Sequence, residues 1–99
     1  MLRLTFPHLE HGEVDLDGER ITIGKDQSNH VVLDFPYVSG SHAEIRQEEG
    51  VPVLVDLGST HGTFVNEERV QKRSLRAGDR VTVGDQELHL EEQEREESG

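Results

Sequence analysis

Residues 39–65 of this chain read SGSHAEIRQEEGVPVLVDLGSTHGTFV, and this stretch decides the fold. Apolar and polar residues alternate on each side of Glu49-Gly50, a pattern typical of strands that bury one face. Glu49-Gly50 itself is a turn signal between two such strands. Small and polar residues fill the two outer segments, 39–42 and 58–63. The stretch therefore predicts two short strands, with a polar loop before the first and another after the second.

The same alternation continues in both directions from this stretch. No segment before residue 86 carries apolar residues at the 3.6-residue spacing of a helix. Many short strands separated by close turn signals predict an all-β fold, either a β-sandwich or a small barrel. The residues expected to share one face of their strand are Leu2, Leu4 and Phe6; Ile21 and Ile23; Ala43 and Ile45; Val51, Val53, Val55 and Leu57; Val81 and Val83; and Leu88 and Leu90.

Three segments allow more specific predictions. Residues 31–33 (VVL) form a continuous apolar run, which predicts a short strand buried on both faces. Gly84 begins a two-residue turn signal that suits a type II′ hairpin. A second hairpin is expected over residues 64–70, around Asn66-Glu67. Glutamate tolerates positive φ less well than glycine, so this turn is expected to be either longer or locally strained.

Size and charge limit the classes of function. The chain has 99 residues, the size of one domain, and no cysteine, which excludes a disulfide framework and a Cys-based zinc site. Its net charge of -11 disfavours binding to nucleic acid or to an anionic membrane, since both need a positive field. The apolar runs are too short for a transmembrane span or a signal peptide. We therefore expect a cytoplasmic protein with no nucleic-acid or membrane partner.

Charge is unevenly distributed along the chain. Half of the ten Lys and Arg residues lie between positions 69 and 80, and five glutamates occupy the last nine residues. We expect residues 1–91 to form the folded domain and residues 92–99 to form an acidic, disordered tail. Both charged segments are then simply solvated. The alternatives are that the tail docks on the basic segment, or that this segment meets an acidic partner.

Three loops concentrate groups that suit an anion. One loop carries Lys25, the second spans residues 39–42, and the third spans residues 58–63. Their small residues leave backbone N–H groups accessible, Ser39 and Thr60 add hydroxyls, and Lys25 adds one positive charge. Such a set of donors is the chemistry of an anion-binding concavity.

The order and spacing of these loops resemble the forkhead-associated (FHA) domain, a module that recognises phosphothreonine. The usual pattern of that family is Gly-Arg, then Ser-x-x-His, then Ser-x-Asn-Gly-Thr-x-x-Asn. The resemblance runs from Ile21 to Gly84. In this chain Lys25 replaces the arginine, His61 replaces the first asparagine, and Gly40 stands where many relatives carry a polar or basic side chain. The resemblance implies a β-sandwich of two mostly antiparallel sheets, with the ligand loops at one end.

The resemblance also implies which residues contact a phosphopeptide. Ser39 is expected to offer its hydroxyl, Gly40 its backbone N–H, and Thr60 its hydroxyl or N–H to the phosphate. Lys25 keeps the charge of the arginine but not its planar fork. His61 carries a donor and an acceptor on opposite ring edges, unlike the side-by-side pair of asparagine that grips a peptide main chain. Protonated, His61 adds charge toward the phosphate and strengthens binding in mild acid.

Five further residues are expected to shape the loops rather than to touch the ligand. His42 is expected to hydrogen-bond within the loops, Gly62 to adopt positive φ, and Thr63 to anchor the following strand. These loop-structuring residues are Gly24, His42, Gly62, Thr63 and Asn66.

The sequence therefore predicts a phosphothreonine-dependent protein–protein interaction module of reduced affinity. The alternative is a degenerate module of the same fold that binds or assembles with another protein independently of phosphorylation. A third interpretation is a purely structural fragment of a larger protein.

Catalysis, metal binding and a cofactor are not expected. Ser39 and Ser41 lie close to His42 in the chain but lack the strand–turn–helix elbow of a serine hydrolase. No pair of the six histidines has a familiar ligand spacing.

Overall fold

The computed structural model describes residues 2–5, 13–16 and 20–92, and in these ranges the chain forms eleven strands. None of the described residues belongs to a helix that could span a membrane. Residues 93–99, most of the predicted acidic tail, lie outside the described residues, and Glu92 is the last residue of the final strand. The strands are β1 (Leu2–Thr5), β2 (Glu13–Leu16), β3 (Ile21–Gly24), β4 (Val31–Val32), β5 (Ala43–Glu48), β6 (Val51–Asp56), β7 (Thr63–Val65), β8 (Glu68–Arg69), β9 (Lys72–Ser74), β10 (Arg80–Val83) and β11 (Gln86–Glu92).

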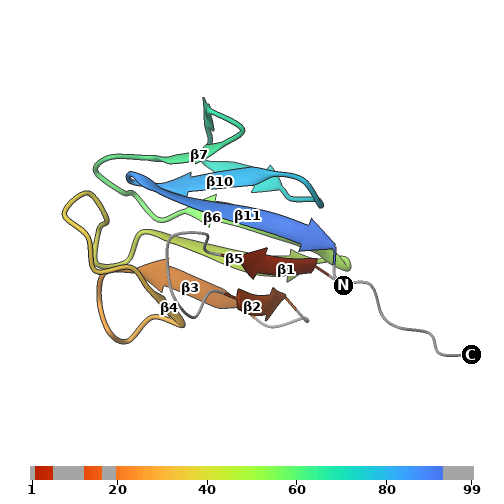
Figure 1. Cartoon of the computed structure of the whole chain (residues 1–99), viewed down its shortest axis with the longest axis horizontal. Helices are drawn as coiled ribbons and strands as arrows, with labels where there is room; N and C mark the ends of the chain where they lie inside the picture. Colours follow the sequence, from red (N-terminus) through yellow and green to blue (C-terminus); the bar gives the residue numbers. More distant parts are fainter. Residues whose placement is uncertain (1, 6–12, 17–19, 93–99) are drawn as a thin grey trace, which may run out of the picture.

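The strands form two separate sheets, as the FHA resemblance implied (Figure 1). One sheet has six strands in the order β2-β1-β11-β10-β7-β8, and the other has five in the order β4-β3-β5-β6-β9. Every strand pair is antiparallel except β3 with β4. The prediction of an all-β fold is confirmed. Because the strands form two separate open sheets, the fold is a β-sandwich and not a closed barrel.

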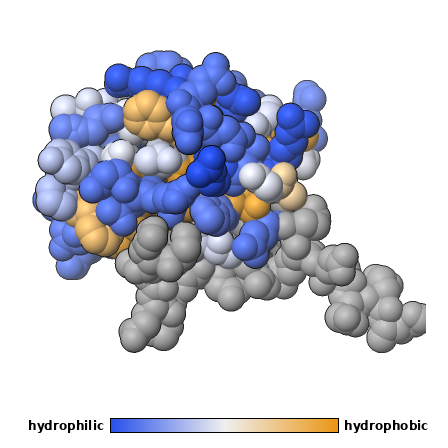
Figure 2. Space-filling model, turned by 45° about the horizontal axis from the view of Figure 1, so that its top comes forward, coloured by the Kyte–Doolittle hydropathy of each residue, from blue (hydrophilic) through white to orange (hydrophobic). Residues whose placement is uncertain are grey.

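A single apolar cluster joins the two sheets. Its members include Ile23 and Ile45 from the five-stranded sheet and Val81, Val83 and Leu88 from the six-stranded one, all at most 1% exposed. These residues follow the alternation expected from the sequence, because successive side chains of a strand point to opposite faces. Figure 2 shows the complementary result, a largely hydrophilic surface with isolated hydrophobic residues.

The prediction of which face of β6 is buried is wrong. Val51 and Leu57 are exposed, and Val53 is buried but lies outside the apolar cluster. The residue of β6 that enters the core is Leu54, which is opposite Ile45 in the β5–β6 register and fully buried. Valine and leucine occupy positions of both parities here, so alternation cannot choose the inner face and the register with β5 decides it.

The prediction for residues 31–33 is also wrong in part. Val31 and Leu33 are buried, but Val32 between them is 40% exposed. The strand β4 contains only Val31 and Val32 and stands at the edge of its sheet, paired with β3 alone. Only one of its faces is covered in the described part of the chain, which explains the exposed valine.

Both predicted hairpins are present. Gly84 has φ of 65° in the turn between Val83 and Gln86, in agreement with the type II′ prediction. Asn66 and Glu67 form the other turn, with φ of 52° and 72°. Strands β7 and β8 pair directly on either side of these two residues, so the turn is not longer than two residues. Of the two expected outcomes, the structure therefore has the strained backbone, with positive φ at Asn66 and Glu67.

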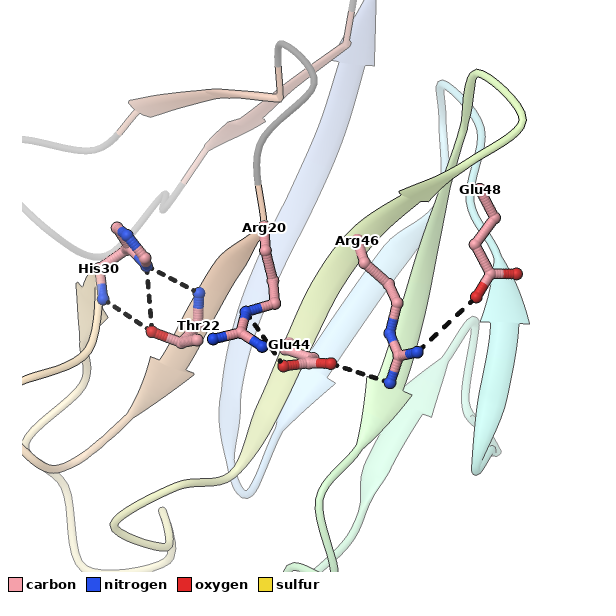
Figure 3. A network of polar contacts seen from close by, with 6 residues as sticks. All are labelled: Arg20, Thr22, His30, Glu44, Arg46 and Glu48. Carbon is pink, nitrogen blue, oxygen red and sulfur yellow. Dashed lines mark hydrogen bonds and ion pairs between the residues drawn. The ribbon is translucent and has the colours of Figure 1, made fainter.

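Charged side chains lie along the outer face of the five-stranded sheet, where Arg20, Glu44, Arg46 and Glu48 form a chain of ion pairs (Figure 3). The Glu44 carboxylate lies 2.9 Å from Arg46 and 3.7 Å from Arg20, and its residue is only 7% exposed. Arg46 also approaches Glu48, which in turn contacts Lys72 at 3.3 Å. The cations of this face are therefore already paired with carboxylates.

Asp56, the last residue of β6, holds the loop that leads into β7. Its carboxylate accepts hydrogen bonds from the backbone N–H groups of Gly58 (2.7 Å) and Ser59 (2.9 Å). It also accepts from the hydroxyls of Ser59 (2.6 Å) and Thr63 (2.7 Å). The loop is thus folded back on one carboxylate, which sets the position of residues 58–63.

These contacts shift the pKa of Asp56. Burial, the largest single influence, raises it, but the four hydrogen bonds together outweigh burial and hold the pKa below its ordinary value of 3.8. A carboxyl group whose pKa is lower in the folded state stabilises the fold above its ordinary pKa. That contribution is lost as the pH falls through the lower folded value.

We predict that Glu67→Gly stabilises the protein by about 1 kcal/mol, because glycine adopts positive φ without the steric cost that an L side chain incurs. The expected rise in the midpoint of thermal unfolding is about 4–8 °C for a domain of this size. The ion pair lost with Arg80 is long, at 3.7 Å, and exposed, so it contributes little. Glu68→Gly, in the adjacent strand, is the matched control and should lower the midpoint; a lower midpoint for Glu67→Gly would contradict the account.

We predict that Asp56→Asn destabilises the protein by on the order of 2 kcal/mol at pH 7, the range for hydrogen bonds to a charged acceptor. Urea unfolding of the wild type and the variant measures the difference. The difference should shrink when both are unfolded at pH 3, because this pH lies below the ordinary pKa of 3.8 and the wild-type carboxyl group then takes up a proton on unfolding. Asp34→Asn, at an exposed position, controls for the change of charge and should alter stability by less than about 0.5 kcal/mol. An equal difference at both pH values would refute the role given to the ionised carboxylate.

Candidate functional site

Three loops meet at one end of the sandwich, at the left of Figure 1. The backbone N–H of Lys25 donates to the Ser39 carbonyl at 2.9 Å, and that of Asp26 donates to the Gly40 carbonyl at 3.2 Å. The N–H of Thr60 donates to the Ser39 hydroxyl at 3.3 Å. Lys25, Gly40 and Thr60 are exposed and Ser39 is half-buried. The backbone positions of these predicted residues are therefore brought together at the surface.

His42 links the loops from inside. Its Nδ1 accepts a hydrogen bond from the Ser39 N–H at 3.0 Å, which assigns the ring proton to Nε2. Nε2 then donates to the Gly62 carbonyl at 2.8 Å, and the residue is completely buried. The backbone of His42 also bonds to Ile23 and Leu57. One neutral imidazole thus joins the second loop to the third.

Gly24 permits the close approach of the first two loops. A Cβ at this position would lie 2.1 Å from the Gly40 carbonyl oxygen, so no other residue fits without moving the backbone. Asn29, which the sequence analysis missed, fixes the same contact. Its side-chain amide donates to the carbonyls of Asp26 and Gly40, both at 2.8 Å.

Gly62 and Thr63 complete the third loop. Gly62 has φ of 94°, and its carbonyl accepts from the Gly84 N–H at 3.2 Å as well as from His42. Thr63 is completely buried and donates its hydroxyl to Asp56. Asp56 was not singled out from the sequence, although an aspartate three residues before Ser59 is a recognisable side-chain turn signal.

His61 is exposed and packs against an aromatic residue. The rings of His61 and Tyr37 meet edge to face, with centroids 4.8 Å apart and planes at 68°. Tyr37 is 53% exposed, and no local pattern in the sequence marks it. This T-shaped contact orients the histidine ring at the rim of the site.

Asn66 lies away from the three loops. Its side chain donates to the Asp79 carboxylate and accepts from the Arg80 N–H, both at 3.0 Å. Asp79, another residue that the sequence analysis missed, also accepts from the Arg76 N–H. Asn66 therefore ties the β7–β8 turn to the start of β10 and does not contact the candidate site.

The charges around the site are of both signs. Lys25 makes no ion pair with any carboxylate of the described residues. The Asp26 carboxylate lies 3.5 Å from the place that a Cβ of Gly40 would take. A side chain at position 40 therefore fits, but it would stand beside a negative charge. Across the described ranges, no group of three or more His, Asp and Glu residues is placed to hold a metal ion.

Comparison with known proteins agrees with this geometry. The model of the FHA domain family matches residues 21–84. The glycogen accumulation regulator GarA of Mycolicibacterium smegmatis is 41% identical over 69 residues, which are 70% of this chain and 44% of that protein. The oxoglutarate dehydrogenase inhibitor of Corynebacterium diphtheriae is 39% identical over 69 residues, 70% of this chain and 48% of that protein. The chain thus spans less than half the length of these relatives.

Solved structures agree over nearly the whole chain. A structure from a study of phosphothreonine-dependent FHA domain interactions superposes with a TM-score of 0.86 at 31% identity, over 95% of this chain and 98% of its own. Mycobacterium tuberculosis EmbR, solved with a low-affinity phosphopeptide, superposes with a TM-score of 0.82 at 30% identity, over 91% of this chain and 24% of its own. On the family match, the shared fold and the shared loop pattern, the chain belongs to the FHA domain family.

Proposed function

We propose that this chain is a phosphothreonine-dependent peptide-binding module without enzymatic activity, acting in the cytoplasm. The observation that carries the proposal is the convergence of Lys25, Ser39, Gly40 and Thr60 through the backbone contacts between their loops. Lys25, Gly40 and Thr60 are exposed there, and they offer a cation, the Gly40 backbone N–H and a hydroxyl, while the half-buried Ser39 adds a second hydroxyl. The relatives named as an inhibitor and as a regulator, and the structure from a study of phosphothreonine-dependent FHA domain interactions, support the same function.

The hydrogen bonds within the site leave specific donors for a phosphate. The Ser39 hydroxyl accepts from the Thr60 N–H, so its own proton can point outward. The Gly40 N–H has no backbone acceptor among the described residues and lies at an exposed position. Since the Thr60 N–H is engaged by Ser39, its hydroxyl is the group that we assign to the phosphate. Lys25 supplies the charge-assisted contact.

His61 is assigned to the peptide rather than to the phosphate. Its ring is oriented by Tyr37 and remains exposed, so one nitrogen can meet a main-chain group of an extended peptide. A single imidazole contact replaces the paired contact of an asparagine amide.

Affinity is expected to be low. The missing arginine fork, the missing side chain at position 40 and the missing amide at position 61 each remove about 1–2 kcal/mol. Because about 1.4 kcal/mol is a tenfold change, the dissociation constant moves from micromolar toward millimolar. The Asp26 carboxylate beside Gly40 adds repulsion. This carboxylate is also the observation that favours the second candidate function, a phosphorylation-independent interaction or assembly module.

We predict that Lys25→Ala and Ser39→Ala each weaken binding of a phosphothreonine peptide about tenfold or more, the loss expected for one charge-assisted hydrogen bond. An NMR titration measures these weak affinities, and unchanged thermal unfolding shows that the fold is intact. Lys72→Ala is the matched control, since it removes a lysine that is paired with Glu48 on the outer face. Equal binding of phosphorylated and unphosphorylated peptides would favour the second candidate function instead.

We predict that Gly40→Arg combined with His61→Asn strengthens phosphopeptide binding at least tenfold. An arginine at position 40 meets only Asp26 near its Cβ, and asparagine restores the paired contact with the peptide main chain. Calorimetric titration of the double variant with phosphorylated and unphosphorylated peptides is the measurement. A folded double variant with no gain would show that other features limit the affinity.

A further inference from the structure

Arg69 lies against the third loop of the site, although it comes from a different element. It is the last residue of β8 and stands opposite Phe64 of β7. A Cβ built on Gly62 would lie 3.0 Å from the Arg69 Nε and 3.2 Å from its Cζ. The guanidinium group therefore touches the loop whose preceding residues, Thr60 and His61, are assigned to the phosphopeptide.

The guanidinium group of Arg69 is also available for a ligand. Arg69 is exposed, and its side chain forms neither a hydrogen bond nor an ion pair with any residue that the structure describes. Its neighbours in the basic segment are engaged: Arg73 contacts Glu68 at 3.0 Å and Lys72 contacts Glu48 at 3.3 Å. The cations of the outer face in Figure 3 are paired as well.

We propose that Arg69 determines the peptide specificity of this domain, by selecting an acidic side chain close to the phosphothreonine. The inference rests on the proposed function and deepens it. A planar guanidinium group with five N–H donors can bind a carboxylate through two parallel hydrogen bonds, which a lysine cannot.

The chain geometry limits where the acidic residue can lie. The Cα atoms of Gly62 and Thr60 are at most about 7 Å apart. The Arg69 Nε lies 3.0 Å from the place of a Gly62 Cβ, so the guanidinium group is on the order of 10 Å from the loop position assigned to the phosphate. An extended peptide advances about 3.3 Å per residue. The carboxylate that reaches Arg69 therefore belongs to a residue no more than about three positions from the phosphothreonine.

The negative net charge of the chain makes a preference for an acidic peptide residue a specific sign of a local cation. With a net charge of -11, the domain repels an acidic peptide as a whole, so acidic flanking residues should generally weaken binding. A position at which aspartate improves affinity requires a local cation that outweighs this field. The improvement should fall at higher ionic strength, because the contact is at the rim of the site.

The test uses a set of phosphothreonine peptides with alanine at every flanking position, and single aspartates placed one to three residues before or after the phosphothreonine. NMR titrations give each affinity relative to the all-alanine peptide. The wild type should prefer aspartate at one position by roughly threefold to fivefold, the upper part of the range of an exposed ion pair. In Arg69→Gln this ratio should fall to about one, and Arg69→Lys should retain part of it.

Arg76→Gln is the matched control. Arg76 is exposed and carries the same charge, and its side chain has no ion-pair partner among the residues described. It lies at the other end of the sandwich, because the adjacent Leu75 N–H bonds to Pro52, far along β6 from Asp56. This variant should keep the aspartate preference of the wild type.

Three outcomes would overturn the proposal. An aspartate profile that is the same in the wild type and in Arg69→Gln removes the specificity role. An equal loss of affinity for the alanine and aspartate peptides shows that Arg69 only supports the loop at Gly62. No binding of any phosphothreonine peptide removes the proposed function itself, and the specificity role with it.

Discussion

The buried imidazole of His42 is the contact on which the site depends. It accepts from the Ser39 N–H and donates to the Gly62 carbonyl, so it fixes the distance between two loops that are far apart in the chain. Gly24 adds the first loop through an approach too close for any Cβ. Because the histidine is fully buried, removing either hydrogen bond would leave a polar group without a partner in the core.

In the proposed function, the site combines hydrogen-bonded loop backbones with exposed donors. Asp56, Asn29 and His42 hold the loop backbones by hydrogen bonds, while Lys25 and Ser39 remain at the surface. Groups held in advance lose little conformational freedom on binding, which offsets part of the affinity lost with the family's arginine and asparagine. In this account the domain recognises a phosphopeptide through a small number of oriented donors rather than through a strongly positive surface.

The sequence predicted the features that depend on local pattern. Alternation gave the core positions of β3, β5, β10 and β11, and the spacing of the loop residues gave the family. Alternation could not identify the buried face of β6, where several apolar residues are adjacent. There the register with β5, which places Leu54 opposite Ile45, decides that Leu54 enters the core. The sequence analysis also missed Tyr37 and Arg69, because their roles come from neighbours that only the folded chain brings close.

We propose that the three loops together bind a phosphate carried by threonine. The decisive measurement records amide chemical shifts while a threonine peptide is added, first in its phosphorylated and then in its unphosphorylated form. We expect only the phosphorylated peptide to shift the amides of Lys25, Ser39, Gly40 and Thr60. Shifts confined to other parts of the sandwich, or identical shifts with both peptides, would contradict this proposal.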